Sequence, residues 1–170
     1  MIKESKLVQK IAFIGLGVMG YPMAGHCKKA GYDVTVFNRT TKKAQTWVDE
    51  FSGKMVLTPK LAAEQAHVIF LCVGNDADLR CVMLGDNGVL AGTNSGDIIV
   101  DKTTAAAEVG REMALLCADV GVGFLDAPVS GGQAGAENRQ LTVMVGGQKD
   151  HYTKVEPVID CYAKFSQLLG

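Results

Sequence analysis

The strongest constraint on the fold of this chain is the glycine pattern Gly15-x-Gly17-x-x-Gly20, which directly follows the apolar run Ile11–Ile14. A glycine at the first position permits a tight turn out of a strand. One at the second lets a phosphate approach the backbone, and one at the third lets a helix pack closely on the sheet. Apolar residues recur at helical spacing after the pattern. The segment therefore predicts a strand, a glycine turn and a helix whose N-terminal amides face a nucleotide pyrophosphate.

A second strand is expected at Tyr32–Phe37, and Asn38 follows it where NAD-preferring sites place an acid on the ribose 2′-hydroxyl. Arg39 instead offers a planar fork that suits a 2′-phosphate, and Thr40 and Lys43 can add donors. Basic side chains at a helix start oppose the helix dipole, so their position is unfavourable without an anion. The sequence favours NADP over NAD, the alternative being that Arg39 and Lys43 are solvated surface charges.

Apolar and amphipathic segments alternate along the rest of the chain. Further strands are expected at 68–73, 97–101, 124–127 and 142–145, and helices at 41–51, 59–66, 76–84, 104–120 and 150–162. The continuous apolar run at 68–73 is typical of a parallel strand buried on both faces. This alternation predicts an α/β, Rossmann-type domain at 10–170, with a doubly wound, mostly parallel sheet and helices on both faces, after a polar tail at 1–9.

Composition narrows the classes of partner. The 170 residues carry a formal net charge of −1 and 48% are hydrophobic, which suits one domain with a sizeable core. There is no long basic run and no bilayer-length apolar stretch, so neither a nucleic-acid nor a membrane partner is expected. The polar start lacks a secretory apolar segment, and a cytoplasmic location is expected. Five cysteines without a CxxC pair predict reduced, buried thiols, and three separated histidines predict no metal site.

Ligands of such sheets bind beyond the carboxyl ends of the strands, and two of these ends carry candidate cofactor contacts. Cys72 and Val73 end a strand and suit the nicotinamide side of a cofactor, although a plain buried strand end explains them equally well. Thr103 and Thr104 follow another strand. One threonine is explained as the cap of the next helix, and the second hydroxyl suits a contact to the carboxamide or the substrate.

A third strand end offers a site for an anion. Ser130 presents a hydroxyl there, followed by the unobstructed backbone amides of Gly131 and Gly132. Such a nest binds an anion, and a carboxylate held there would bring its neighbouring carbon toward a nicotinamide. The alternative is a flexible glycine turn.

Four segments together resemble the β-hydroxyacid dehydrogenase family, which includes 3-hydroxyisobutyrate dehydrogenases, tartronate semialdehyde reductases and glyoxylate or succinic semialdehyde reductases. They are IAFIGLGVMGYPMA, VFNRT, DKTT and DAPVSGGQAGAENRQLTVMVGG, and the resemblance covers nearly the whole chain. VFNRT is similar to the NADPH-preferring branch. The resemblance implies reversible reduction of a small aldehyde or keto acid to its hydroxy acid. It implies that the substrate carboxylate is held by Ser130, Gly131 and Gly132, and the cofactor by Gly15, Leu16, Gly17, Val18, Met19, Gly20, Asn38, Arg39, Thr40, Lys43, Cys72, Val73 and Thr104.

The family continues into an all-helical second domain that supplies a general acid/base lysine and most of a dimer interface. Here that lysine would lie beyond Gly170, so we expect a chain that binds NADP(H) but has little turnover alone, with a homo-oligomeric parent. Lys102 is the alternative proton donor by location. DKTT stands where D-x-S-T is usual, and Arg139 where a glycine is common. Two other functions stay open: a non-catalytic dinucleotide-binding module, and an imine reductase, against which the Ser130–Gly132 stretch argues.

Overall fold

The computed structural model describes residues 10–103 and 106–169, so the tail predicted at 1–9 lies outside the described residues. Its main sheet is parallel throughout, in the order β3-β2-β1-β4-β5-β6. The strands are β1 (Lys10–Ile14), β2 (Asp33–Phe37), β3 (Lys54–Met55), β4 (Val68–Leu71), β5 (Ile98–Asp101) and β6 (Gly123–Asp126). The order reverses direction at β1, next to β4, which is where a doubly wound sheet opens a crevice for a ligand. The predicted Rossmann-type α/β class is confirmed.

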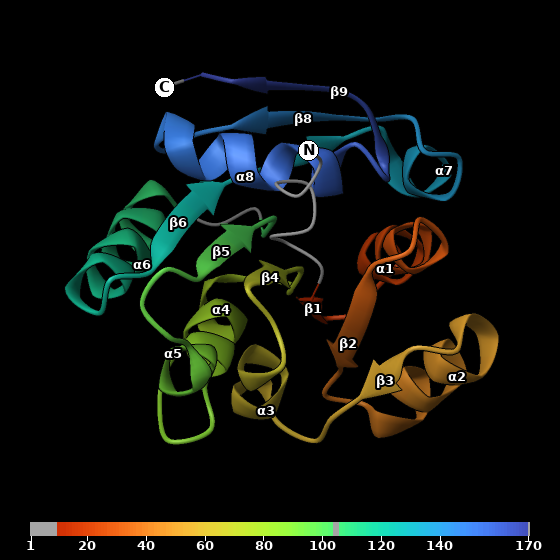
Figure 1. The fold of residues 1–170 in the computed structure, drawn as a ribbon, viewed down its shortest axis with the longest axis horizontal. Coiled ribbons are helices and arrows are strands. Elements are labelled where there is room, and N and C mark those ends of the chain that lie inside the picture. The colour runs from red at the N-terminus through yellow and green to blue at the C-terminus, as the bar shows by residue number, and fades with distance from the viewer. Residues whose placement is uncertain (1–9, 104–105, 170) are drawn as a thin grey trace, which may run out of the picture.

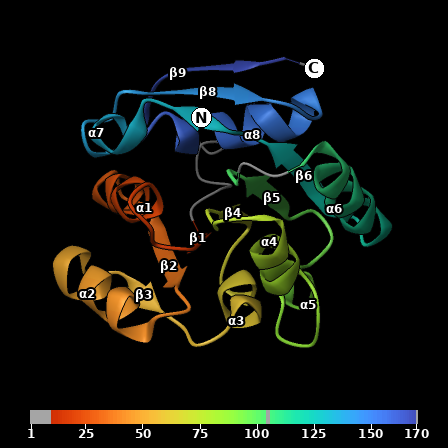
Figure 2. The same ribbon diagram turned by 180° about the vertical axis from the view of Figure 1, so that it is seen from behind.

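Helices cover both faces of this sheet because successive strand residues point to opposite sides. Ile11 and Phe13 of β1 belong to a core shared with α1, α2 and α8, whereas Ala12 and Ile14 belong to a core shared with α3 to α6. Figures 1 and 2 show α8 on one side of the sheet and α3, α4 and α5 on the other. The helices are α1 (Gly20–Lys29), α2 (Thr41–Phe51), α3 (Pro59–Glu64), α4 (Asp76–Met83), α5 (Val89–Gly92), α6 (Ala107–Asp119), α7 (Gly132–Glu137) and α8 (Lys149–Ile159).

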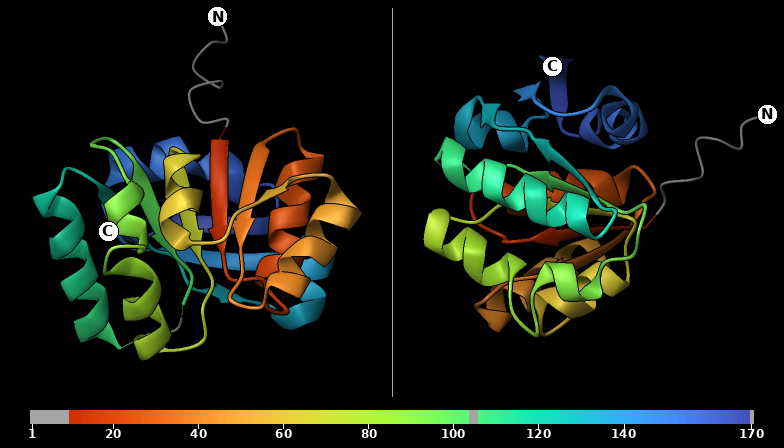
Figure 3. Two further views of the ribbon diagram at one scale, coloured as in Figure 1. Left: turned by 90° about the horizontal axis from the view of Figure 1, so that it is seen from below. Right: turned by 90° about the vertical axis from the view of Figure 1, so that its left-hand side faces the viewer.

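A second, smaller sheet departs from the expectation that the strand at 142–145 joins the main sheet. It contains β7 (Val129–Ser130), β8 (Leu141–Val145) and β9 (Ala163–Leu168), with β7 antiparallel and β9 parallel to β8. Pro128 lies between β6 and β7 and has no N–H for a sheet ladder, so the chain leaves the main sheet there. Figure 3 shows this sheet and α8 together on one side of the main sheet. The two sheets touch where Asp126, at the end of β6, forms an antiparallel bridge with Gly146, just after β8.

Arg139, which stands where the family commonly has glycine, lies in the turn before β8. Its φ of 59° is in the left-handed region that glycine adopts most easily. The side chain compensates by donating from Nε to the Cys161 carbonyl oxygen at 3.1 Å. The turn therefore keeps a glycine-like backbone conformation with an arginine in it.

Between the main sheet and α8 lies a buried layer that we call the seam, comprising Cys27, Phe70, Lys102, Cys161 and Tyr162. The expectation of buried thiols holds for Cys27, Cys161 and Cys117, but it is wrong for Cys81, which is exposed on α4, while Cys72 is half-buried. Cys81 is exposed because α4 covers the sheet with its opposite side, through Leu79 and Met83. Within the described ranges, no helix is long and apolar enough to cross a membrane.

Candidate functional site

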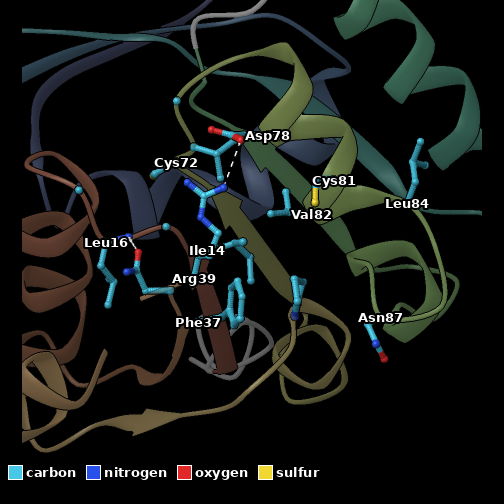
Figure 4. A pocket seen from close by; sticks show the side chains of 16 residues that line it. Ile14, Leu16, Phe37, Arg39, Cys72, Asp78, Cys81, Val82, Leu84 and Asn87 are labelled. Atoms are coloured by element: carbon cyan, nitrogen blue, oxygen red, sulfur yellow. Dashed lines mark hydrogen bonds and ion pairs between the residues drawn. The ribbon is translucent and has the colours of Figure 1, made fainter. Parts of the chain in front are cut away.

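A cavity of about 420 Å³ opens at the carboxyl ends of β1, β2 and β4, beside the point where the strand order reverses. It is bounded by the glycine turn, the end of β2 and the start of α4 (Figure 4). Its lining residues are Ile14, Gly15, Leu16, Gly17, Phe37, Asn38, Arg39, Pro59, Cys72, Val73, Gly74, Asp78, Cys81, Val82, Leu84 and Asn87. This is the crevice that the topology of the sheet predicts.

The glycine turn is built so tightly that side chains cannot enter it. Gly15 has a φ of 103°, and a Cβ there would overlap the carbonyl oxygen of Cys72. Its N–H donates to the Phe37 carbonyl oxygen at 2.9 Å, which ties the turn to the end of β2. At Gly17, by contrast, a Cβ would meet nothing within 4 Å. The first glycine thus shapes the backbone, and the second leaves it open toward the cavity.

Asn38 joins the two strand ends that flank the cavity. Its Oδ1 accepts from the Leu16 N–H at 2.9 Å, and its Nδ2 donates to the Thr40 carbonyl oxygen at 3.1 Å. The amide side chain therefore organises the backbone on both sides of the cavity.

Arg39 reaches across the cavity to the opposite wall. Its Nη1 lies 3.6 Å from Oδ1 of Asp78 in the first turn of α4, as the dashed line in Figure 4 marks. The Arg39 side chain is 86% exposed and that of Asp78 is 31% exposed. A planar, solvated guanidinium at the mouth of this cavity is well suited to bind an anionic group.

The wall opposite β2 was not foreseen in the sequence. Asp78, Cys81 and Val82 come from α4, and they share one face because they are spaced i, i+3 and i+4. The Asn75 side chain caps this helix by accepting the Asp78 N–H at 2.9 Å. Only the position of this helix directly after a predicted strand end pointed to the crevice, because any helix brings residues at this spacing to one face.

Several predicted cofactor residues lie beside the cavity without lining it. Val18 and Met19 precede α1, which begins at Gly20, while Thr40 and Lys43 lie at the start of α2. Thr104 lies outside the described residues.

The second strand end ties β4 to β5. Thr103 does not cap α6, whose N-cap residue is Ala106, so that expectation is wrong for this threonine. Its Oγ1 accepts from the Val73 N–H at 3.3 Å instead, and its own N–H donates to Asp101 at 2.8 Å. Burial raises the pKa of Asp101 to about 6 and that of the Cys72 thiol to about 12.

The predicted anion nest lies apart from this cavity, at the start of α7. Ser130 ends β7 and is exposed, and Gly131 and Gly132 follow with φ values of 130° and 65°. Both φ values lie in the left-handed region, which glycine adopts most easily. All three residues are exposed to solvent.

Lys102, the alternative proton donor, points into the seam. Its Nζ lies 4.7 Å from the ring centroid of Tyr162 and 5.6 Å from that of Phe70, and it donates to the Ala127 carbonyl oxygen at 3.5 Å. Burial lowers the pKa of this amine to about 8. The side chain does not line the cavity. Nor does any group of three or more His, Cys, Asp or Glu side chains in the described part of the chain suit a metal ion.

Comparison with known proteins gives this geometry a context. Residues 10–170 match the family described as the NAD binding domain of 6-phosphogluconate dehydrogenase. An uncharacterized oxidoreductase of Shewanella frigidimarina is 56% identical over 161 residues, which are 95% of this chain and 55% of that protein. The chain therefore spans about half the length of this relative.

Two solved structures share the fold closely. Psf3 in complex with NADP+ and 2-OPP has a TM-score of 0.89 at 27% identity, over 94% of this chain and 56% of that chain. The 3-hydroxyisobutyrate dehydrogenase of Mycobacterium tuberculosis, solved with L-serine, has a TM-score of 0.88 at 29% identity, over 96% of this chain and 55% of that chain.

Proposed function

The chain belongs to the family of the NAD binding domain of 6-phosphogluconate dehydrogenase, and on that premise we propose that it is the NADP(H)-binding half of a hydroxyacid reductase. The reaction is the reversible reduction of a small aldehyde or keto acid, of the semialdehyde or glyoxylate type, to the hydroxy acid. The observation that carries the proposal is the cavity between the glycine turn and Arg39. Support for the substrate class comes from the Mycobacterium tuberculosis enzyme, a 3-hydroxyisobutyrate dehydrogenase.

The residues present fit a dinucleotide. A Cβ on Gly15 or Gly20 would collide with neighbouring backbone, whereas Gly17 leaves open space beside the turn where a pyrophosphate can approach. The apolar wall that includes Val82 and Leu84 suits the flat face of an adenine. Gly15 to Gly20, with Asn38, Thr40, Lys43, Cys72, Val73 and Thr104, are proposed to hold the cofactor.

Asn38 and Arg39, which follow β2, favour NADP over NAD as the cofactor. Asn38 replaces the acid that would hold a free ribose 2′-hydroxyl, and it is already engaged with Leu16 and Thr40. Arg39 remains as a solvated fork for a 2′-phosphate. The complex of the similar Psf3 with NADP+ agrees with this choice.

NADPH, when bound, supplies a hydride to the substrate carbonyl carbon. The chain's own part is to position the reactants: the nest at Ser130, Gly131 and Gly132 is proposed to hold the substrate carboxylate through its hydroxyl and backbone N–H groups. A carboxylate nest is the reason to prefer a hydroxyacid reaction over imine reduction. It also orients the carbonyl without contributing a proton.

The proton donor is proposed to come from the part of the relatives' length that this chain does not span. Lys102 is turned into the seam, where its Nζ lies over the ring of Tyr162 and donates to the Ala127 carbonyl oxygen. A positioned general acid contributes about 10²- to 10⁴-fold, so little turnover is expected of this chain alone. The same observation favours one second candidate, a non-catalytic dinucleotide-binding module. A cytoplasmic location and a homo-oligomeric parent remain predictions.

Calorimetric titration of the chain with NADPH and NADH tests the proposal. We expect tighter binding of NADPH and a loss of about 10- to 100-fold in NADPH affinity in Arg39→Ala, because a charge-assisted bond to the phosphate is removed. Arg80→Ala is the matched control, since Arg80 pairs with Glu112 at 2.7 Å and does not line the cavity. Equal binding of both cofactors, or an Arg39→Ala variant that keeps its NADPH affinity, would contradict the assignment.

A further inference from the structure

An acid faces the proposed 2′-phosphate position, although none follows β2 in the sequence. Asp78 projects from α4 across the cavity and lies 3.6 Å from Arg39 (Figure 4). The residue that pairs with Arg39 thus comes from the opposite wall of the site, from an element that the glycine pattern does not include. Within residues 10–103 and 106–169, this is the ion pair that Arg39 makes.

The N-cap of α4 holds the backbone of Asp78, whose N–H donates to Asn75 Oδ1 at 2.9 Å. Asp78 Oδ2 lies 3.3 Å from where a Cβ on Gly74 would be, so the glycine leaves room for the carboxylate. The other acid of this helical turn, Asp76, is directed elsewhere, since its Oδ1 accepts the Ala106 N–H at 3.1 Å. The Asp78 carboxylate is therefore the acidic group that α4 presents to the cavity.

The Arg39–Asp78 pair is loose. Its separation of 3.6 Å exceeds the roughly 2.7–2.9 Å of a charge-assisted hydrogen bond, and Arg39 is largely exposed. Exposed pairs of this kind contribute little to stability and break easily. The Asp78 carboxylate is therefore close enough to attract the Arg39 guanidinium but does not fix the orientation of the guanidinium.

We propose that Asp78 is a specificity-determining residue that competes with the cofactor 2′-phosphate for Arg39 and so limits the preference for NADPH over NADH. A phosphate monoester carries about −1.5 to −2 charges at neutral pH, so phosphate and carboxylate cannot share one guanidinium without repulsion. NADH has a neutral hydroxyl at this place and does not require Arg39 to leave Asp78. This inference rests on the proposed function, because it assumes that the cavity binds the adenosine end of the cofactor.

The test compares the binding of two adenosine nucleotides that differ in the 2′-phosphate. Adenosine 2′,5′-bisphosphate and adenosine 5′-monophosphate carry the adenosine end with and without the 2′-phosphate, and neither needs the nicotinamide side of the site. In Asp78→Asn, the affinity for the bisphosphate is expected to rise about three- to tenfold at low salt, with little change for the monophosphate. The gain shrinks at high ionic strength, because exposed charges are screened.

Two further variants separate competition from a general charge effect. Glu112→Gln removes the same charge from the ion pair with Arg80, away from the cavity, and leaves both affinities unchanged. In an Arg39→Ala background, Asp78→Asn gives no gain for the bisphosphate. A gain that persists in full there would overturn competition for Arg39.

Other outcomes also have definite meanings. A fall in bisphosphate affinity in Asp78→Asn would show that Asp78 positions Arg39 for the phosphate, which overturns the proposal, and so would an unchanged affinity. If the unaltered chain binds neither nucleotide nor NADPH, the proposed function itself fails. Bisphosphate binding that depends on Arg39 but not on Asp78 defeats this inference alone.

Discussion

The cavity and the seam each contain one prominent cation, but the surroundings of the two cations are opposite. Arg39 at the cavity is 86% exposed and loosely paired with Asp78. Lys102 in the seam is 6% exposed, and its Nζ lies over the rings of Phe70 and Tyr162. The solvated Arg39 lowers the free energy of unfolding little and can exchange Asp78 for another anion. The desolvated cation is fixed in place and has a lowered pKa.

Because Arg39 is exposed, it can bind a ligand, whereas the buried Lys102 affects only the stability of the fold. Among the described residues, the hydroxyl of Tyr162 has no hydrogen-bond partner although it is buried, so one polar group of the seam is unsatisfied. The cavity keeps its polar groups at the solvent boundary, where a ligand can replace water. Changes at the seam should therefore alter the free energy of unfolding, whereas changes at the cavity mouth should alter binding.

The largest expected effect is at Gly15, which lines the cavity and also shapes the backbone of the turn. Gly15→Ala should lower the free energy of unfolding by more than about 3 kcal/mol, because a Cβ overlaps the Cys72 carbonyl and the backbone is left-handed. Gly31→Ala is the matched control. Gly31 has a φ of 105° but nothing within 4 Å of its Cβ position, so only about 1–2 kcal/mol should be lost. Equal losses in urea denaturation would contradict the packing argument.

Gly17→Ala should change cofactor binding rather than stability, in contrast to Gly15→Ala. Apart from Gly17 and its two chain neighbours, no residue in the described part of the chain has an atom within 4 Å of a Cβ there, so the variant should unfold at nearly the same urea concentration as the unaltered chain. NADPH affinity should nevertheless fall, since the methyl group occupies the approach of the pyrophosphate. A large loss of stability would show that Gly17 shapes the turn, as Gly15 does.

An effect of intermediate size on the free energy of unfolding is expected at Lys102 in the seam. Lys102→Met should raise the free energy of unfolding by about 2 kcal/mol at pH 7, because a desolvated ammonium is replaced by an apolar side chain. The folded pKa of about 8 lies below the unfolded value, so the unaltered chain regains stability as the pH rises from 8 toward 10. The advantage of methionine should therefore shrink over that range. Urea denaturation at pH 7 and pH 10 measures it, with the exposed Lys154→Met as control.

The absence of a pH-dependent difference between Lys102→Met and the unaltered chain would mean that the seam amine is solvated. A destabilised Lys102→Met would mean that its contacts with the two rings outweigh its desolvation.

The smallest expected effect concerns thiols in the two regions. Cys81 is exposed and lines the cavity, whereas Cys27 and Cys161 are buried in the seam. Maleimide should therefore label Cys81 first, and saturating NADPH should slow that labelling about threefold or more by covering the thiol. Cys81→Ser should abolish the fast phase. Labelling of Cys81 that is equally fast with and without NADPH would place the cofactor elsewhere.

Sequence patterns predicted β1, β4 and β5 well because these strands are buried on both faces and read as largely apolar runs. The two-residue strand β3 is not buried and was not predicted. The second sheet was harder. β9 contains no fully buried residue, and the adjacent Lys164 and Phe165 are both exposed, so it lacks a strong apolar signal. The departure at Pro128 separates β8 from a main sheet that it was expected to extend.

In the site, residues within short sequence motifs were predicted, whereas a residue that only the fold brings to the cavity was not. The glycine turn and Arg39 lie in short local motifs, and the structure brings them to one cavity. Asp78 escaped notice because a first-turn aspartate beside a cap such as Asn75 is fully explained by helix capping and the helix dipole. Its approach to Arg39 depends on how α4 crosses the sheet, which no short segment encodes.

The most direct test of the account is a crystal structure of the chain with NADP+ bound. We predict the pyrophosphate over the turn at Gly15–Gly20 and the adenine against Val82. The 2′-phosphate should lie within hydrogen-bonding distance of the Arg39 guanidinium, which should have moved away from Asp78. A cofactor bound outside this cavity, or a 2′-phosphate in solvent while Arg39 stays paired with Asp78, would contradict the central claim.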